Sequence, residues 1–378
     1  PPLFPLLKAE FGVSYVELGL AMTAYNLLGG VLQAPVGFLV DRLGPRRVLL
    51  SGLCLTAASV MLMGFVDTYA MLLVLALVAG LGNSVFHPAD YAILTGSIDP
   101  NRLGRAFSLH TFAGYLGSAL APVTMLALAQ WADWRMALSV SGAVGLAVLA
   151  VMIVRREVLQ GEDISAKDVT ETETQSNSTS SNGGIAVVLS PAVLLFLLYF
   201  ILFAMGSSGL TAFTVSALIN LHGLGLEQAN AALTAHLFGM VGGILLAGII
   251  ADRYVRHLVT AAGSLVLAAV SLTLVVVLTP PGWVLIVIMT VAGVGLGGVL
   301  PVRDLMIRAV TPPGQSGKVF GFVFVGYAIG SSTAPVLYGW FLDAGAPALV
   351  FFAAAGFAMV ALGALIVARR VGDKAANN

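Results

Sequence analysis

The sequence predicts an all-α membrane protein, and three observations lead to that prediction. Hydrophobic residues make up 58% of the 378 residues, only 10% are charged, and the mean hydropathy is +0.97, far from the composition of soluble domains. Stretches without Asp, Glu, Lys or Arg recur, each about the 20 residues needed to cross a bilayer. Because backbone groups in lipid must be satisfied within a segment, and barrel strands alternate polar and apolar residues, these stretches are helices. They lie at residues 48–66, 136–154, 258–279 and 344–368.

Taken in order along the chain, the apolar spans predict eleven helices. Residues 1–14 contain no Met and resemble the end of an earlier helix followed by a loop, so we expect one span to be missing from this chain. A signal peptide is not expected there, because the stretch lacks a basic start and an apolar core. The helices are expected near residues 17–40, 47–66, 69–95, 104–130, 136–154, 191–220, 229–251, 258–279, 282–307, 317–342 and 346–368.

A polar segment divides these helices into two groups. Residues 157–184 contain too few apolar side chains to offset the entropy lost when the segment is ordered. We therefore expect a flexible linker at residues 157–190, between an N-terminal bundle at 1–156 and a C-terminal bundle at 191–370, with a tail at 371–378.

The basic residues indicate an orientation. Only Lys8 and Arg135 fall on one side of the expected membrane, so the positive-inside rule places the other side, with the linker and the C-terminus, in the cytoplasm. We expect a multi-pass protein of a bacterial cytoplasmic membrane. A net charge of zero gives no reason to expect a nucleic-acid partner. The cytoplasmic set is Arg42, Arg46, Arg47, Arg102, Arg105, Arg155, Arg156, Lys167, Arg253, Arg256, Arg308, Lys318, Arg369, Arg370 and Lys374.

The second half of the chain repeats the first. GRAFSLHTFAGYLGSALAPV from residue 104 aligns with GKVFGFVFVGYAIGSSTAPV from residue 317 at an offset of 213, and the same offset relates Pro88 to Pro301. A shorter echo relates GIIADRYVRH, from residue 248, to GFLVDRLGPRR, from residue 37. Two parallel repeats of six helices give twelve if the first helix is absent.

Residues 37–47 resemble the signature of the major facilitator superfamily, G-x-x-x-D-R-x-G-R-R/K, and the resemblance covers nearly the whole chain. It implies two pseudo-symmetric six-helix bundles that move a small solute by alternating access, coupled to protons or another ion, in a monomer without a cofactor.

GYLGSALAP resembles the family's glycine-proline motif, but Ala121 replaces the glycine usual in antiporters, which argues against drug export. NSVFHPAD resembles a His-Pro element of organic-solute and fosmidomycin-resistance-like branches. The proposed gating motif comprises Gly37, Asp41, Arg42, Gly44, Arg46 and Arg47, with Asp252 and Arg253 in a second copy where Val255 replaces the later glycine.

The motif has a physical role independent of its name. Asp41 ends one helix on the cytoplasmic side, where the helix near Ser316 begins, so its carboxylate can cap that helix for roughly 0.3 to 2 kcal/mol. The contact would close the inner side and favour the outward-open state. The alternative is that the motif arginines only set topology. Close helix packing is expected at Gly37 and at three glycine pairs, Gly239 with Gly243, Gly293 with Gly297, and Gly326 with Gly330.

Charges inside the membrane are costly and tend to mark a pathway. Asn83, His87 and Asp90 are spaced to share one face of a helix beside a proline. The repeat places Asp90 opposite Arg303, so this pair is expected to close the inner gate. In the alternative, Asp304 pairs with Arg308 one helical turn away.

Other polar residues leave two interpretations open. An imidazole titrates near neutral pH, so His87, with Asp90, is the expected proton carrier, although a histidine on an apolar helix is often a core residue. His110 and His236 are further candidates, and His222 is expected in an outer loop. Residues that line a polar cavity, or only bond helix to helix, are Tyr25, Asn26, Gln33, Ser207, Ser208, Thr211 and Thr214.

No phosphate-binding loop, catalytic triad or metal-ligand spacing occurs in a credible context, and the single Cys54 excludes disulfides, so neither an enzyme nor a metal site is expected. Arg303 favours an anionic solute such as a carboxylate. The alternatives are proton-driven export of drugs or metabolites, a transporter-like receptor and a channel.

Overall fold

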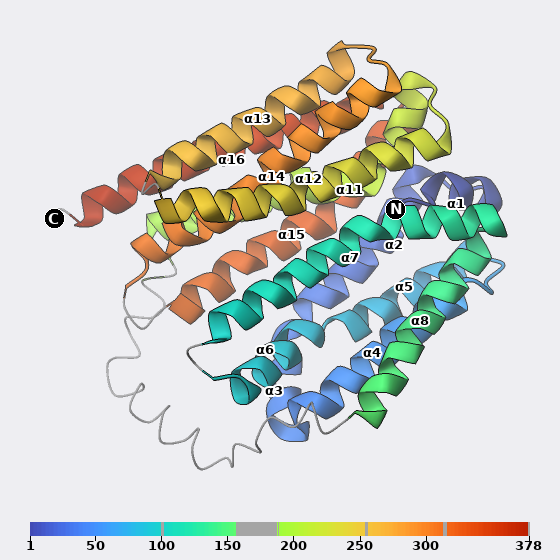
Figure 1. Ribbon diagram of the computed structural model, residues 1–378, viewed down its shortest axis with the longest axis horizontal. Coiled ribbons are helices and arrows are strands. Elements are labelled where there is room, and N and C mark those ends of the chain that lie inside the picture. The colour runs from blue at the N-terminus through green and yellow to red at the C-terminus, as the bar shows by residue number, and fades with distance from the viewer. Residues whose placement is uncertain (100–101, 156–186, 188, 254–255, 313–315, 377–378) are drawn as a thin grey trace. The chain divides into compact units, whose positions relative to one another are not determined.

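The computed structural model describes residues 1–99, 102–155, 187, 189–253, 256–312 and 316–376, and no strand occurs within these ranges (Figure 1). The expected linker at residues 157–190 falls almost wholly outside them. Contacts divide the chain into two units, which are considered separately. Unit 1 comprises Pro1–Thr23, Tyr115–Ala127 and Gly184–Asn378; unit 2 comprises Ala24–Gly114 and Leu128–Gly183.

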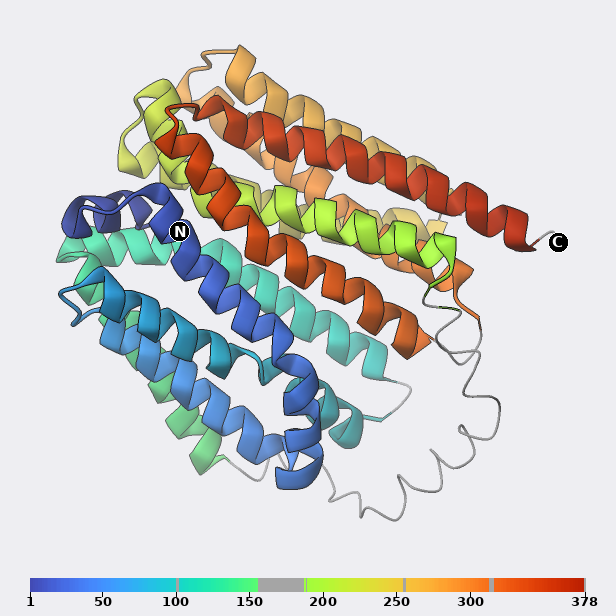
Figure 2. The same cartoon turned by 180° about the vertical axis from the view of Figure 1, so that it is seen from behind.

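Unit 1 is built around α14, which packs against α12 and α13, and around α11, which packs against α15 and α16. Figure 2 shows α15 and α16 joined by a short connection, and α11 contacts both of them. The unit also holds α1 and the first residues of α2. The helices are α1 Phe4–Phe11, α2 Tyr15–Val31, α11 Pro191–His222, α12 Leu226–Arg253, α13 His257–Val277, α14 Gly282–Val310, α15 Ser316–Asp343 and α16 Ala348–Ala376.

Glycines allow the helices of unit 1 to touch through their backbones. A Cβ added to Gly239 or Gly243 of α12 would collide with backbone carbonyls of α14, and one added to Gly293 or Gly297 would collide with carbonyls of α12. Gly326 and Gly330 of α15 meet α11 in the same way. The predicted packing of all three glycine pairs is therefore confirmed.

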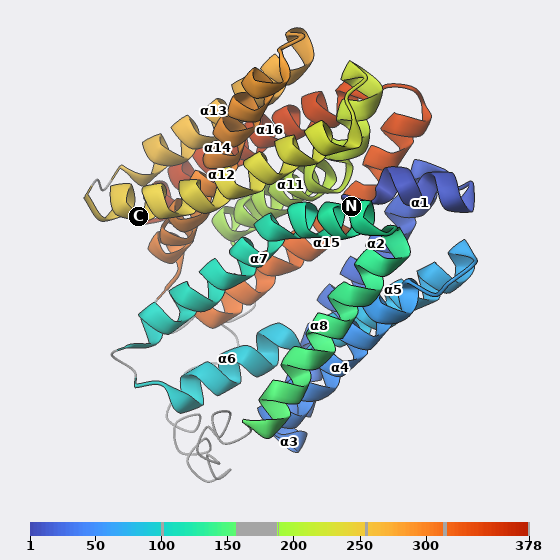
Figure 3. The ribbon, with the colours of Figure 1, turned by 45° about the vertical axis from the view of Figure 1, so that its right-hand side comes forward.

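Unit 2 is organised by α4, which packs against α8, α5 and α6, as can be followed in Figure 3. Aliphatic side chains of α3, α4 and α6 form one buried cluster that includes Val36, Val48 and Ala89. Helix α7 contributes Tyr115–Ala127 to unit 1 and its other residues to unit 2. The bounds are α3 Gln33–Leu43, α4 Pro45–Met63, α5 Tyr69–Asn83, α6 Phe86–Ser97, α7 Leu103–Trp131 and α8 Trp134–Val154.

Two helices that the sequence predicts as continuous are broken. The helix expected at 17–40 is bent by 56° between α2 and α3, and the helix expected at 69–95 is interrupted between α5 and α6. The breaks precede Pro35 and Pro88, whose rings remove a backbone donor and crowd the carbonyl four residues earlier. At the first break the side chain of Gln33 donates to the Gly29 carbonyl at 3.1 Å, which satisfies an oxygen left by the interruption.

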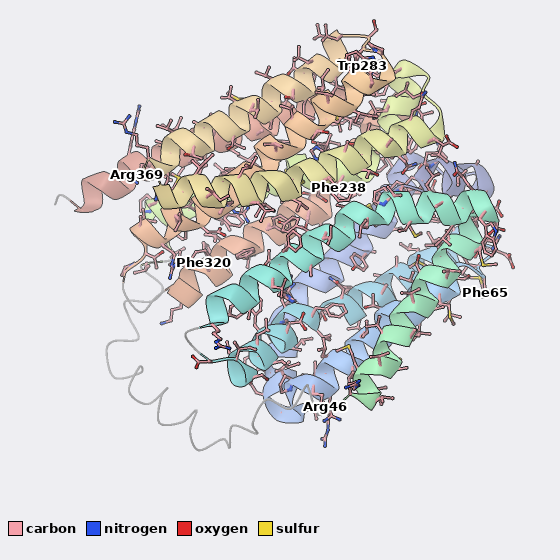
Figure 4. All side chains as sticks on the ribbon, viewed as in Figure 1. Arg46, Phe65, Phe238, Trp283, Phe320 and Arg369 are labelled. Carbon is pink, nitrogen blue, oxygen red and sulfur yellow. The ribbon has the colours of Figure 1, made fainter. Side chains whose placement is uncertain are left out.

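Ten helices of the described chain are long and apolar enough to cross a membrane, or eleven if the bent pair α2 and α3 is one span. The expected number of spans agrees with the higher figure. Within unit 1, Arg369 and Phe320 lie toward one end of the helices and Trp283 at the other (Figure 4). Arg369 thus lies at the opposite end of this unit from Trp283.

Candidate functional site

Arg303 lies on α14 with its guanidinium buried inside unit 1. The side chain is 7% exposed, and its Cζ lies 4.4 Å from the ring centroid of Phe200 and 5.4 Å from that of Phe203. Nε donates to Oδ1 of Asp304 at 3.3 Å, whereas Nη1 has no hydrogen-bond partner among the described residues. Part of this arginine's hydrogen-bonding capacity is therefore unused. Such a buried charged donor without a partner is costly.

Three tyrosines surround the same guanidinium. Tyr115, Tyr199 and Tyr327 each lie within electrostatic range of Arg303. Tyr199 is fully buried, its ring stacks on Phe203 at 5.8 Å, and its hydroxyl has no well-formed hydrogen bond within the described part of the chain. The sequence analysis missed these tyrosines. The only available signal was the i, i+4 spacing of Tyr199 and Phe203 on one helix face.

Asp304 resolves one of the alternatives left open by the sequence. Its carboxylate pairs with Arg303, the adjacent residue, at 3.3 Å. Arg308 is exposed, and no ion pair joins it to Asp304 within residues 256–312. The buried arginine is therefore only partly neutralised, by one carboxylate whose own side chain is 45% exposed.

In unit 2, Asp90 of α6 lies beside a histidine. Its Oδ2 is 3.6 Å from Nε2 of His110 on α7. The ring of Tyr91 lies 6.3 Å from that of His110 and 5.9 Å from that of His87, and meets Phe107 edge-on at 5.0 Å. One carboxylate and two imidazoles thus gather in one part of this unit, and an imidazole is a side chain that can exchange protons near neutral pH.

The helix predicted to carry Asn83, His87 and Asp90 is interrupted, although Tyr69–Ser97 still forms one candidate span, and the shared face stays a prediction. Asn83 is the last residue of α5, and the other two lie on α6 after the interruption. Pro88 explains the difference, because it removes the hydrogen bond that would join residues 84 and 88.

The expected gate between Asp90 and Arg303 links unit 2 to unit 1 and stays a prediction. Each residue has a local partner in its own unit, His110 for Asp90 and Asp304 for Arg303. His236 is fully buried on α12, where Nδ1 lies 3.3 Å from the Met289 carbonyl and Nε2 has no partner in the described chain. Its surroundings are those of a packed core residue.

Several polar residues expected near a cavity bond to helix backbones instead. Thr211 and Thr214 donate to carbonyls one turn earlier in α11, at 2.8 and 2.6 Å, and Ser208 donates to Ser331 of α15 at 3.4 Å. His222 lies at the end of α11, with Nε2 2.9 Å from the Val275 carbonyl. The helix-bonding interpretation fits these residues, while Tyr25, Asn26 and Ser207 stay candidates for a polar cavity.

The signature motif forms the turn between α3 and α4. Gly44 has φ of 84°, a left-handed conformation that favours glycine, and this explains its place in the motif. Asp41, Arg42 and Arg47 are exposed.

The close packing predicted at Gly37 is wrong, because a Cβ there meets nothing within 4 Å in the described structure. The capping of the helix at Ser316 by Asp41 joins the two units and stays a prediction, as do the roles of Asp252 and Arg253, whose side chains lie outside the described residues.

Residues 1–230 and 197–378 match the Major Facilitator Superfamily, and the chain belongs to this family. It is 27% identical over 258 residues to the Fosmidomycin resistance protein of Escherichia coli strain K12, covering 68% of this chain and 61% of that protein. It is 32% identical over 143 residues to the probable sulfoacetate transporter SauU of Cupriavidus necator, covering 38% and 33%. The chain thus spans less than two thirds of these relatives.

Two further matches cover more of the chain. An uncharacterised transporter of the same family from Bacillus subtilis, YfnC, is 24% identical over 349 residues, 91% of this chain and 82% of that one. The structure is similar to that of a bacterial homologue of the human lysosomal transporter Spinster in an inward-facing, unoccupied conformation, with a TM-score of 0.77 and 12% identity over 99% of this chain and 93% of the other. The chain therefore belongs to the Major Facilitator Superfamily and has the fold of its solved members, with ten or eleven helices in the described residues that are long and apolar enough to cross a membrane.

Proposed function

We propose that this chain is a secondary active transporter that moves a small organic anion by alternating access, coupled to protons. The observation that carries the proposal is the buried Arg303, whose unpartnered Nη1 lies among aromatic rings and beside the Tyr199 hydroxyl. A guanidinium binds carboxylate or sulfonate oxygens through charge-assisted hydrogen bonds. Inside a membrane such a group offers a positive charge and hydrogen bonds in place of the hydration that an anion loses when it leaves water.

Proton coupling is assigned to unit 2. Asp90 and His110 lie 3.6 Å apart and form a carboxylate–imidazole pair that can take up or release a proton, and the ring of His87 lies 5.9 Å from the adjacent Tyr91 ring. Protonation of this pair and solute binding at Arg303 would each alter the charge of one unit, which is how a proton gradient can bias a two-state cycle. We expect a monomer in a bacterial cytoplasmic membrane, with the linker and the C-terminus in the cytoplasm.

The remaining sequence assignments are retained as parts of this proposal. Asp41 and the arginines of its motif form the inner gate, with Asp252 and Arg253 as the second copy. The solute and proton pathway comprises Asn83, His87, Asp90, Arg303, Asp304, His110, His236, Asn26 and Gln33.

The names of two relatives support an anionic solute. One is a probable sulfoacetate transporter, and another, 24% identical over 140 residues, is a probable L-galactonate transporter of Escherichia coli strain K12. Sulfoacetate and L-galactonate are both anions at neutral pH, and both carry oxygens that a guanidinium can bind in pairs.

Export of a drug or metabolite is the second candidate. It is favoured by the names of the Fosmidomycin resistance protein and of a Multidrug resistance protein B homolog of Mycobacterium tuberculosis, 27% identical over 151 residues. The same scaffold serves both directions, since the gradients determine the net flux.

The test is uptake of radiolabelled sulfoacetate and L-galactonate into proteoliposomes that contain the full-length protein, with and without an imposed pH gradient. Accumulation that needs the gradient and stops with a protonophore supports coupled uptake. Accumulation only in vesicles of inverted orientation supports export. Gradient-independent leakage without counterflow indicates a channel and contradicts the proposal.

A further inference from the structure

The N-terminal segment of the chain is docked on the C-terminal helices within unit 1. The Phe4 ring of α1 lies 5.4 Å from the ring of Phe213 on α11. Tyr15, the first residue of α2, meets the same ring edge-on at 6.2 Å, and its hydroxyl accepts a hydrogen bond from Nδ2 of Asn220 at 3.2 Å. The contact is therefore both apolar and polar.

The start of α2 is capped by a residue from the far end of the chain. Asp343, the last residue of α15, accepts hydrogen bonds from the backbone N–H groups of Tyr15 and Val16, at 2.9 Å to Oδ1 and 2.8 Å to Oδ2. A helix leaves its first N–H groups without partners, and a carboxylate at this end also interacts favourably with the helix dipole. The carboxylate that satisfies these two donors lies 328 and 327 residues away in the sequence.

Local capping satisfies the other donors of this helix end. The Ser14 hydroxyl accepts from the Glu17 N–H at 3.1 Å, and the Glu17 carboxylate accepts from the Ser14 N–H at 2.8 Å, which is a capping box. Glu17 thus leaves the N–H groups of Tyr15 and Val16 to Asp343. Because the two sets of bonds are separate, the helix can keep its local cap when Asp343 moves away.

Below this cap, α2 and α15 form a close antiparallel seam. A Cβ on Gly339 would lie 2.5 Å from the Tyr15 carbonyl, and one on Gly19 would collide with the Pro335 carbonyl. The Thr23 hydroxyl donates to the Ser332 carbonyl at 2.6 Å. The first of the three segments of unit 1 ends at Thr23, so the seam spans the part of α2 that belongs to this unit.

Lys8 of α1 adds a charge to the cap. Its Nζ lies 3.7 Å from Oδ1 of Asp343, 4.4 Å from the Tyr15 ring centroid and 3.2 Å from the Val13 carbonyl, to which it donates. The lysine and aspartate side chains are 37% and 24% exposed, so water weakens their attraction. The two hydrogen bonds to α2 are the larger contribution to the contact.

We propose that Asp343 is a releasable latch, which holds the start of α2 against unit 1 while the outer side is closed and lets it go when that side opens. Asp343 ends α15 at the opposite end from Lys318, so by the positive-inside rule the latch faces outward. The inference rests on alternating access in the proposed function, but it assigns a position and a residue that the inner-gate motif does not include.

The test uses the full-length protein in lipid nanodiscs, with spin labels at Leu20→Cys on α2 and Val277→Cys on α13 in a Cys54→Ser background. Leu20 and Val277 are both exposed. Pulsed electron paramagnetic resonance then measures the distance between the labels. We expect Asp343→Ala to raise the ratio of the longer-distance population to the main one about tenfold, equivalent to about 1.4 kcal/mol, and Asp343→Asn, which keeps one acceptor, to raise it about threefold.

Asp133→Ala is the matched control. Asp133 also caps a helix, α8, but by a local bond from the Met136 N–H at 2.7 Å, so its loss should leave the label distance unchanged. An unchanged distribution in Asp343→Ala, or an equal shift in the control, overturns the latch. If Asp343→Ala does not fold, the Asn variant decides in the same way. Because this readout needs no solute, a normal latch shift without anion uptake contradicts the proposed function and leaves the latch intact.

Discussion

The proposed solute site depends on one residue, Arg303, which belongs to no obvious motif. A buried guanidinium is tolerated when carboxylates or other acceptors satisfy its donors, yet here one aspartate meets Nε and the rings of Phe200 and Phe203 cover the faces. Aromatic faces attract a cation but accept few hydrogen bonds. The donor that is left over is what an anionic solute would use.

We therefore expect Arg303→Lys to reduce sulfoacetate uptake by at least tenfold, because an ammonium group keeps the charge but loses the planar set of donors. The measurement is the initial uptake rate in proteoliposomes against solute concentration. Arg308→Lys is the matched control on the same helix, since Arg308 is exposed, and it should change the rate less than twofold. Equal effects of the two changes would contradict the assignment of Arg303.

The histidines of unit 2 allow a second comparison at this scale. His110 contacts the Asp90 carboxylate, whereas His87 touches only the Tyr91 ring in the contacts described above. We expect His110→Gln to abolish accumulation driven by a pH gradient while solute counterflow continues, because exchange needs no net proton movement. His87→Gln should keep gradient-driven accumulation. Loss of both activities in His110→Gln would indicate a structural role for this residue.

At the scale of the element, the sequence predicted where helices lie better than whether they are continuous. Pro35 and Pro88 lie just after breaks, whereas Pro122, Pro301 and Pro335 lie inside continuous helices. A proline removes the same donor in every case, and the outcome depends on whether neighbouring groups satisfy the freed carbonyl. That information is tertiary, so the spacing of residues 83, 87 and 90 could not reveal the interruption.

The seam between α12 and α14 yields a prediction on stability. Gly243→Ala should lower the free energy of unfolding by roughly 1–3 kcal/mol, because the new methyl group meets the Val294 carbonyl. Gly242→Ala, one residue earlier, meets nothing within 4 Å and should be neutral or stabilising by up to about 1 kcal/mol. Thermal unfolding of the purified protein measures both, and similar midpoints for the two variants would show that the seam tolerates a methyl group.

At the scale of the whole molecule, the duplication read from the sequence is retained in the helices. Pro122 and Pro335 each lie 19 residues after the first residue of α7 and α15, and the repeat partners Pro88 and Pro301 each lie 19 residues after the first residue of α5 and α14. The offset of 213 residues between the repeated sequences predicted that the two halves of the chain share one order of helices. It did not predict that Pro1–Thr23 groups with the C-terminal helices, because this docking depends on Asp343, Phe213 and Asn220, which lie outside the repeated sequences quoted above.

The pairing of Asp90 with Arg303 remains the prediction that concerns both halves at once. If these charges meet when the inner side closes, each must leave a partner in its own unit, His110 or Asp304. The exchanged variant, Asp90→Arg with Arg303→Asp, should then keep the inner side closed more often than Asp90→Ala or Arg303→Ala, because the attraction survives with its sign reversed. The distance between spin labels at the inner ends of α4 and α14, measured without solute by pulsed electron paramagnetic resonance, reports this coupling. An equal loss of the closed state in all three variants would mean that the two charges act separately, Asp90 with His110 and Arg303 with the solute.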